Sequence, residues 1–415
     1  MATHKQKQYS VLTMNTVAFA FNFAVWTMFS IIGIKIKQEL GLSDTQFGIL
    51  VATPILTGSI TRLPLGILTD RYGGRIVFSV QMILVACATY GLAFANQYWQ
   101  YLLAGLFVGL AGGSFAIGIA YTSAWFEKEK QGTAMGIFGA GNAGAAITNL
   151  VAPMIVVAAG WQMVPKVYSI AMLIMAIVFW FFTFNDPKQV ERAKSGTHIP
   201  LKQQLAPLKE LRVWRFGLYY YFVFGGFVAL ALWLPKYYVG EYGLDLKTAS
   251  FITMIFTLPS GVIRALGGYL SDKVGARKVN WWVFWFSIAA LFFLSYPQTS
   301  MTIKGIDGDM NFDIGLSMWF FTALVFIVGI AQGIGKASVY RIIHDYYPDN
   351  MGSVGGMVGV IGGLGGFTLP IIFGLLSDYT NIRSSCFMLL FGLVGVCMLW
   401  MNYAIVQQKK ESELL

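Results

Sequence analysis

GILTDRYGGR, residues 66–75, recurs in the second half of the chain as GYLSDKVGAR, residues 268–277. Together with the arginine four residues before each copy, five identical residues keep one separation of 202 positions. They are Arg62, Gly66, Asp70, Gly73 and Arg75, paired with Arg264, Gly268, Asp272, Gly275 and Arg277. One matching glycine arises easily by chance, but five fixed spacings with two arginines and an aspartate do not. The chain is therefore predicted to contain two repeated halves.

A second set of glycines repeats at a separation of 220 positions. Gly109, Gly113, Gly132, Gly136 and Gly139 pair with Gly329, Gly333, Gly352, Gly356 and Gly359. The change of separation indicates a longer loop in the second half, around residues 303–313.

The composition is typical of a protein embedded in a lipid bilayer. Of the 415 residues, 56% are hydrophobic and 12% are charged, whereas a soluble domain has about 25% charged residues. The net charge of +10 comes mainly from short loops between apolar runs, so it predicts membrane topology and no nucleic-acid partner. The three cysteines lie inside apolar runs without metal-ligand spacing, which predicts no metal site, no cofactor and no disulfide framework.

Twelve apolar runs are long enough to cross a bilayer as helices. They cover residues 11–34, 46–68, 76–95, 99–123, 133–159, 164–184, 213–235, 247–270, 279–297, 315–340, 352–376 and 384–406. We expect an all-α membrane protein of twelve transmembrane helices in two pseudo-symmetric six-helix halves, residues 1–184 and 213–415, joined by a cytoplasmic linker over residues 185–212. Both repeats start from the same side of the membrane, so the halves are predicted to be parallel repeats with a binding site between them.

The loops predict the orientation in a bacterial inner membrane. With both termini in the cytoplasm, 19 of the 29 Lys and Arg residues lie on the cytoplasmic side, seven lie outside, and three lie within helices. This bias favours cytoplasmic termini.

The three cations within helices are Arg62, Arg264 and Lys336, and no Asp or Glu lies in the middle of a predicted helix. A charge inside the bilayer normally has a partner or a wet cavity, so we expect the missing negative charge to be the cargo. Snorkelling to the interface is the alternative. It suits Lys336, near the end of its run, better than the two arginines, which precede their loop aspartates by eight residues, about 12 Å of helix. The planar guanidinium fork suits a small flat oxyanion, although a phosphate ester stays open.

The repeated loop resembles the signature loop between helices 2 and 3 of the major facilitator superfamily, and GLLSD, ending at Asp378, is a fainter third copy. The resemblance implies that the loop closes the cytoplasmic side through Asp–Arg pairs and helix ends. Its implied gating residues are Asp70, Arg71, Arg75, Asp272 and Arg277. An ordinary positively charged cytoplasmic loop is the alternative reading.

The glycine-rich segments carry a narrower resemblance. Residues 109–144, which end in GIFGAGNAG, and residues 355–374, GGMVGVIGGLGGFTLPIIFG, are similar to the two signatures of the nitrate/nitrite porter family. The resemblance implies an anion clamp of Arg62 and Arg264. Three aromatic side chains are implied as pocket walls: Phe115, Tyr220 and Phe224. Asn142, an amide among glycines, is expected to contact the substrate. The run Tyr219, Tyr220, Tyr221 leaves the register of the seventh helix open.

The resulting expectation is a transporter of nitrate or nitrite, with proton-coupled import favoured over nitrate/nitrite exchange. Lys336 is the candidate for proton coupling. A porter of another small anion and a membrane sensor remain as alternatives, although a sensor would normally carry a soluble output domain. No catalytic constellation lies inside the membrane, so an enzyme is not expected. The expected partners are nitrate or nitrite, protons and the lipid bilayer, and the residues leave the oligomeric state open, a monomer included.

Overall fold

The computed structural model describes residues 3–185, 206–347 and 351–413, and the chain is almost entirely helical there. The predicted linker, residues 185–212, lies largely outside the described residues. In the first half the helices are α1 (His4–Thr27), α2 (Phe29–Leu40), α3 (Asp44–Ile60), α4 (Arg62–Tyr72), α5 (Gly74–Leu92), α6 (Tyr98–Val108), η1 (Gly109–Gly113), α7 (Ser114–Trp125), α8 (Lys128–Gly139), η2 (Ala140–Ala143), α9 (Gly144–Ala159) and α10 (Met163–Phe182).

The second half has the same helical character with one β-hairpin added. Its elements are η3 (Ala206–Lys209), α13 (Leu211–Tyr220), η4 (Tyr221–Gly225), α14 (Gly226–Tyr242), α15 (Leu246–Val262), α16 (Arg264–Val274), α17 (Ala276–Leu294), β1 (Thr299–Gly305), β2 (Gly308–Ile314), α18 (Met318–Tyr346), α19 (Met351–Thr380) and α20 (Ser385–Glu413). By length and composition, ten of the described helical segments could cross a membrane, and the bent pair α15–α16 makes an eleventh. The remaining predicted run, 279–297, falls mostly within α17, whose first turn carries Arg277 and Lys278.

The two spans that carry the repeated arginines are both interrupted just before them. Thr61 separates α3 from α4, and Ile263 separates α15 from α16, where the axes bend by 44°. Pro259 lies within α15, four residues before this break, and it removes a backbone donor from the last turn, which accounts for the bend. Arg62 and Arg264 are therefore the first residues of α4 and α16.

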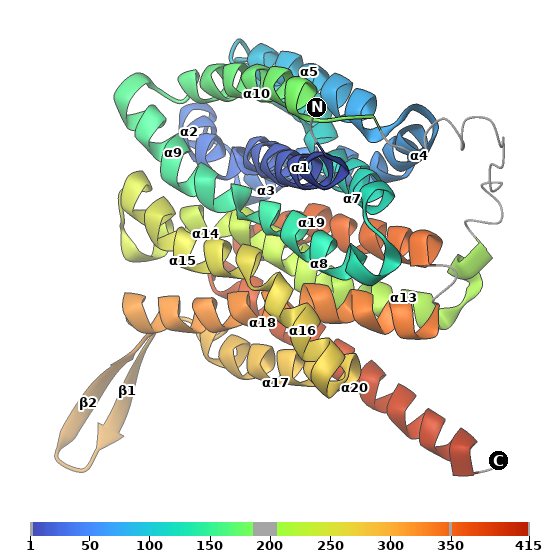
Figure 1. Cartoon of the computed structure of the whole chain (residues 1–415). Helices are drawn as coiled ribbons and strands as arrows, with labels where there is room; N and C mark the ends of the chain where they lie inside the picture. Colours follow the sequence, from blue (N-terminus) through green and yellow to red (C-terminus); the bar gives the residue numbers. More distant parts are fainter. Residues whose placement is uncertain (1–2, 186–205, 348–350, 414–415) are drawn as a thin grey trace.

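The repeated loop turns at a glycine in the same place in each copy. Gly73 has φ 86° and Gly275 has φ 97°, a region that residues with a Cβ rarely adopt. Each glycine ends one helix and begins the next, so α4 is followed at once by α5 and α16 by α17. These turns lie at one end of the bundle, together with the start of α13 and the end of α20 (Figure 1). We call it the linker end, because the predicted linker precedes α13 in the sequence.

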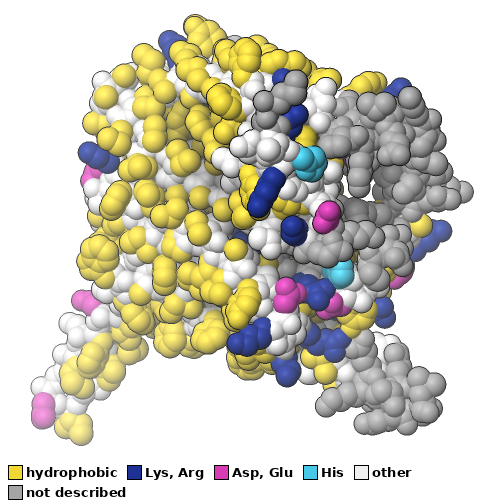
Figure 2. Space-filling model, in the orientation of Figure 1, with side chains coloured by type: hydrophobic (Ala, Val, Ile, Leu, Met, Phe, Trp, Pro, Cys, Tyr) yellow, Lys and Arg dark blue, Asp and Glu magenta, His cyan; other side chains and the backbone are white. Residues whose placement is uncertain are grey.

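The opposite end, which we call the hairpin end, holds the turns from α2 to α3 and from α14 to α15, and the strands β1 and β2. Hydrophobic side chains cover the visible flank of the bundle, and charged side chains gather mostly toward the linker end (Figure 2). A helical bundle with an apolar flank and charged ends matches a bilayer, so this is a multi-pass membrane protein.

The halves touch through equivalent close contacts. A Cβ on Gly363 of α19 would lie 2.3 Å from the Ser59 hydroxyl oxygen of α3, and a Cβ on Gly261 of α15 would lie 2.8 Å from the backbone nitrogen of Ala143. Ser59 and Gly261 are 202 positions apart, and Ala143 and Gly363 are 220 apart, so the two contacts obey the repeat. Small residues at these points let α3 approach α19 and η2 approach α15.

Candidate functional site

Arg62 lies at the contact between the halves with its side chain buried, 6% exposed. Its Nη1 donates a 2.9 Å hydrogen bond to the carbonyl oxygen of Gly359, on α19 of the other half. Three aromatic rings surround the guanidinium, whose carbon lies 5.0 Å from the Phe224 centroid, 5.1 Å from that of Phe115 and 6.0 Å from that of Trp26. The charge is thus held among ring faces, which attract cations.

Arg264 occupies the matching place in the second half. Its guanidinium carbon lies 5.5 Å from the Phe115 centroid and 5.8 Å from the Tyr340 centroid. Both arginines therefore lie against the ring of Phe115, which comes from α7. The structure brings the two repeated arginines together, as the repeat predicted.

Each arginine also lies against a glycine of the opposite half. A Cβ on Gly139 would lie 3.1 Å from Arg264 Cδ, and a Cβ on Gly359 would lie 3.7 Å from Arg62 Nη1 and 3.0 Å from the Tyr340 hydroxyl. Gly139 and Gly359 are themselves a repeat pair. The sequence revealed both pairs but not that each arginine would reach across to the glycine of the other half.

Several polar atoms around this point have no hydrogen-bond partner among the described residues. They include Arg62 Nε, Arg264 Nη1 and both side-chain polar atoms of Asn142. Asn142 is fully buried in η2, directly beside Gly261 of α15. Buried donors without partners cost free energy, so these donors are suited to an anion that enters from outside the protein.

The structure selects one of the three consecutive tyrosines for this cluster. The Tyr220 ring stacks on Phe224, with centroids 5.2 Å apart and planes 6° apart, and meets Tyr340 edge-on at 5.0 Å. Tyr219 instead packs against Phe284, and the Tyr221 hydroxyl bonds to Thr368. The segment Tyr221–Gly225 is a π-helical turn, a local widening that is frequent at functional sites.

Lys336 lies deeper than the sequence indicated. Because α18 continues to Tyr346, six residues beyond the predicted run, Lys336 is fully buried within the helix and not near its end. Its Nζ donates a 3.2 Å hydrogen bond to the carbonyl oxygen of Ser260 and lies 3.3 Å from the Phe227 ring centroid. Snorkelling is thereby excluded for this residue.

Among the described residues, no buried carboxylate balances these cations. Within the described residues, the buried charged side chains are those of Arg62 and Lys336, and no Asp or Glu is among them. The region around Arg62, Arg264 and Lys336 is therefore strongly electropositive in a low-dielectric surrounding. This arrangement can attract an anion.

Four of the five predicted gating residues make contacts within their own halves. Asp272 accepts a 2.6 Å salt bridge from Arg341 Nε, and Arg277 donates to the Tyr346 hydroxyl. Arg75 Nη2 donates a 2.6 Å hydrogen bond to the carbonyl oxygen of Trp180. Arg71 lies over the ring of its neighbour Tyr72, and Asp70 is exposed at the end of α4. Closure of the linker end by these residues stays a prediction.

The hairpin end carries polar contacts that do join the halves. Asp378, at the end of α19, accepts hydrogen bonds from the backbone nitrogens of Asp44 (3.0 Å) and Thr45 (2.8 Å) at the start of α3. Asp44 in turn forms a 2.7 Å salt bridge with Lys236 of α14 and accepts a hydrogen bond from Ser377. Asp378 of the GLLSD motif thus caps α3 of the first half at the hairpin end. The two loops that the motif resembles, residues 66–75 and 268–277, lie at the linker end.

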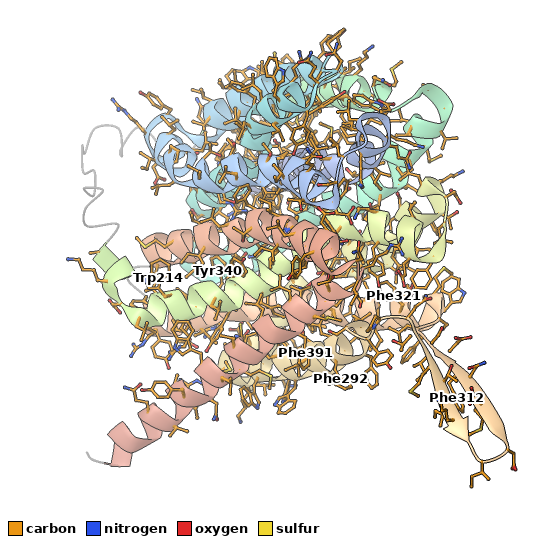
Figure 3. The ribbon with its side chains drawn as sticks, turned by 180° about the vertical axis from the view of Figure 1, so that it is seen from behind. Trp214, Phe292, Phe312, Phe321, Tyr340 and Phe391 are labelled. Carbon is orange, nitrogen blue, oxygen red and sulfur yellow. The ribbon has the colours of Figure 1, made fainter. Side chains whose placement is uncertain are left out.

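Several neighbours of the three cations carry no recognisable sequence signal. Trp26, Phe227, Ser260 and Tyr340 belong to no repeat pair or motif, and only the fold brings them to the cations. Figure 3, from the opposite side, shows Tyr340 among the densely packed side chains inside the bundle.

Comparison with known proteins matches the family described as Major Facilitator Superfamily over residues 16–308 and 248–414. The "Probable nitrate/nitrite antiporter NarK1" of Thermus thermophilus is 41% identical over 412 residues, covering 96% of this chain and 91% of that protein. The "Probable nitrate transporter NarT" of Staphylococcus carnosus is 32% identical over 400 residues, covering 96% and 97%. The "Nitrite extrusion protein" of Bacillus subtilis is 30% identical over 385 residues, covering 92% and 91%.

Two solved structures share the fold at low identity. A bacterial homologue of the human lysosomal transporter Spinster, in an inward-facing and occupied conformation, has a TM-score of 0.69 at 16% identity and covers 96% of this chain and 97% of its own. The nucleoside transporter NupG (D323A mutant) has a TM-score of 0.71 at 14% identity and covers 95% and 99%.

Proposed function

Because this chain belongs to the nitrate/nitrite porter family of the major facilitator superfamily, we propose that it carries nitrate or nitrite across the membrane by alternating access, with Arg62 and Arg264 as the anion clamp. One observation carries the proposal: two arginines from opposite halves meet at Phe115, with unpartnered donors and no buried carboxylate among the described residues. The choice of nitrate or nitrite as the transported anion rests on the names of the relatives.

The clamp suits a small planar anion. Each guanidinium offers parallel N–H donors in one plane, which match the oxygen spacing of a flat oxyanion and give charge-assisted hydrogen bonds. Rings of Phe115, Phe224 and Tyr220 border the arginines, so they would pack against the faces of such an anion while the donors hold its edge. Asn142, buried and unpartnered beside Gly261, would supply a further donor.

The same arrangement would couple binding to closure. Arg62 contacts Gly359 of the second half, and Arg264 packs on Gly139 of the first. Two like charges repel when no anion lies between them, and the repulsion is strong where the dielectric is low. A bound anion would remove this repulsion and let the halves approach, which is how binding between repeats drives alternating access.

We place the linker end in the cytoplasm and the protein in the inner membrane. The segments predicted to be cytoplasmic carry 19 of the 29 Lys and Arg residues, and cytoplasmic loops are the basic ones. These segments include the turns at Gly73 and Gly275, which lie at the linker end. The hairpin end would then face outward. The division into halves at residues 1–184 and 213–415 is part of this proposal.

We assign proton coupling to Lys336. It is a third cation, fully buried and held between the Ser260 carbonyl and the Phe227 ring, and no described carboxylate is buried with it. A buried lysine can lose its proton, whereas arginine cannot at working pH. Proton uptake by Lys336 as the anion arrives would drive nitrate import. Exchange of nitrate for nitrite is the competing mode, favoured by the name of the 41% identical relative.

Proteoliposomes separate these modes. Purified protein is reconstituted, and labelled nitrate uptake is measured under an inward proton gradient with no nitrite inside, or with nitrite inside and no gradient. Gradient-driven accumulation that a protonophore abolishes supports symport, and uptake that needs internal nitrite supports exchange. Absence of uptake in both conditions would overturn nitrate as the cargo.

A further inference from the structure

The hairpin formed by β1 and β2 has one apolar and one polar face. The strands are antiparallel with Met301 opposite Phe312 and Ile303 opposite Met310, and residues directly opposite each other share a face. Side chains of one face are apolar and between 42% and 50% exposed: Met301, Ile303, Met310, Phe312 and Ile314. Ile306, at the turn, is fully exposed.

The other face consists of polar side chains that bond to one another. Ser300 donates a 2.7 Å hydrogen bond to Asp313, and Thr302 donates one of 2.7 Å to Asn311. Lys304 stands opposite Asp309. The hairpin is therefore amphipathic, and its apolar face is exposed.

This hairpin is an addition to the second half. The separation between repeated residues rises from 202 before it to 220 after it, a difference of 18 that nearly equals the 16 residues from Thr299 to Ile314. It leaves the ends of α17 and α18 obliquely, running past α17 and away from the first half, and both ribbon views show the same course (Figures 1 and 3). It projects beyond the body in the space-filling view as well (Figure 2).

The surface at the root of the hairpin is aromatic and exposed. On α17 and just after it, Phe292, Phe293 and Tyr296 are 47–62% exposed, and on α18 Trp319 and Phe320 are 65% and 49% exposed. Trp and Tyr concentrate where a membrane protein passes through the headgroup layer, and Tyr296 and Trp319 are of this kind. β1 begins three residues after Tyr296, and β2 ends five residues before Trp319, so the hairpin adjoins these aromatic side chains along the chain.

We propose that the hairpin lies on the membrane surface at the hairpin end, with its apolar face in the boundary between lipid headgroups and acyl chains. A two-stranded hairpin alone is marginally stable in water, so contact with lipid would stabilise it. Its open strand edges cannot enter hydrocarbon, where backbone groups need partners, and this keeps it at the boundary. The polar face, with Lys304, Asp309 and Asp313, then faces water. The hairpin anchors α17 and α18 to the surface.

The test compares labels attached to adjacent hairpin residues, one on the apolar face and one on the polar face. Cys87, the exposed native cysteine, is replaced by serine, and Phe312→Cys or the adjacent Asn311→Cys is labelled with the polarity-sensitive fluorophore NBD. In proteoliposomes of phosphatidylcholine and phosphatidylglycerol, we expect the label at 312 to show blue-shifted emission, quenching by doxyl lipids and loss of quenching by aqueous iodide. The label at 311 should show the reverse.

Two results overturn the proposal. Equal iodide quenching at 311 and 312 places the hairpin in water, and a label at 312 shielded from both quenchers places a second protein copy on the face. Met310→Cys and Asp309→Cys repeat the comparison, so that loss of one apolar side chain does not decide the result. The readout does not depend on the transported anion.

Discussion

At the scale of single residues, the clamp rests on the shape of arginine as much as on its charge. We predict that Arg62→Lys or Arg264→Lys lowers nitrate uptake by about 10- to 100-fold, because a point-charge ammonium cannot replace a planar fork and a charge-assisted hydrogen bond contributes about 1.5–3 kcal/mol. Initial uptake rates in proteoliposomes measure the loss. Arg383→Lys, at an exposed position beside Glu241, is the control and should keep normal uptake. Equal losses in all three variants would contradict the clamp.

The glycines opposite the arginines give a second residue-scale prediction. Gly139→Ala and Gly359→Ala place a methyl group against Arg264 Cδ at 3.1 Å or the Tyr340 hydroxyl at 3.0 Å. We expect these tight contacts to displace the side chains and to raise the KM for nitrate roughly tenfold, since small misplacements at a site have large effects. Gly356→Ala, one helical turn before Gly359 with nothing within 4 Å, should leave the KM unchanged. A KM that stays normal at 139 and 359 would show that the arginines tolerate the methyl group.

Lys336 carries the third residue-scale prediction. Lys336→Met keeps a long apolar stem between Ser260 and Phe227 but removes the proton and the charge. We expect this variant to lose nitrate accumulation driven by a proton gradient. It should still exchange nitrate for internal nitrite, because Arg62 and Arg264 remain in place. Uptake under a proton gradient and counterflow without one are measured on the same vesicles. Accumulation that still follows the gradient would remove Lys336 from the coupling mechanism.

The sequence predicted the two arginines of the site better than its lysine and its tyrosine, for physical reasons. Arg62 and Arg264 were found because a repeated charge in an apolar run is costly and therefore informative. The depth of Lys336 was underestimated because hydropathy places the end of a helix poorly where polar residues such as Arg341 and His344 continue it. Tyr340 was missed since an aromatic ring in an apolar helix has no signal that separates a site from ordinary packing.

At the scale of elements, the repeated loop was predictable and the hairpin was not. Gly73 and Gly275 stand where a positive φ is required, so sequence and geometry agree there. The sequence showed only a longer loop at residues 303–313, because a single pair of short strands gives weak alternation beside long apolar helices. The register of the helix around Tyr220 depended on a π-helical turn, which no spacing rule anticipates.

The cap across the halves gives an element-scale prediction. Asp378→Ala removes an acceptor for two backbone N–H groups of α3. Loss of an N-cap costs about 1 kcal/mol, which shifts a two-state equilibrium about fivefold. Spin labels at Gln46 and Tyr379, both exposed, should show a larger population of long distances. Asp245→Ala removes a cap of α15 within the second half, where Asp245 accepts from Thr248, and should leave these distances unchanged. The cap has no role in closure if both variants give the native distribution.

At the scale of the whole molecule, close contacts at two levels join the halves. Ser59 with Gly363 and Ala143 with Gly261 obey the repeat and lie beside the arginines, whereas the contacts between α3 and α19 at the hairpin end have a different chemistry, built on Asp44 and Asp378. The contacts near the arginines are therefore symmetric, whereas those at the hairpin end are not. This pattern suits an alternating-access transporter in which the halves rock about the binding site and each end closes through its own contacts.

Separation of α3 from α19 should therefore open the hairpin end without touching the clamp. A Cβ on Gly374 would lie 2.3 Å from the backbone oxygen of Asp44, so Gly374→Val wedges the helices apart at a cost of about 1–3 kcal/mol. Ile55 is fully buried against Gly366 of α19, so a cysteine in its place reports whether the hairpin end opens. In the Gly374→Val variant, we expect this cysteine to react faster with a membrane-impermeant thiol reagent added at the hairpin end. We also expect nitrate uptake to slow, because that end no longer closes. Gly392→Val on α20, with nothing within 4 Å, should change neither quantity. Unchanged labelling in the Gly374 variant would mean that the contact between α3 and α19 is not the barrier at this end.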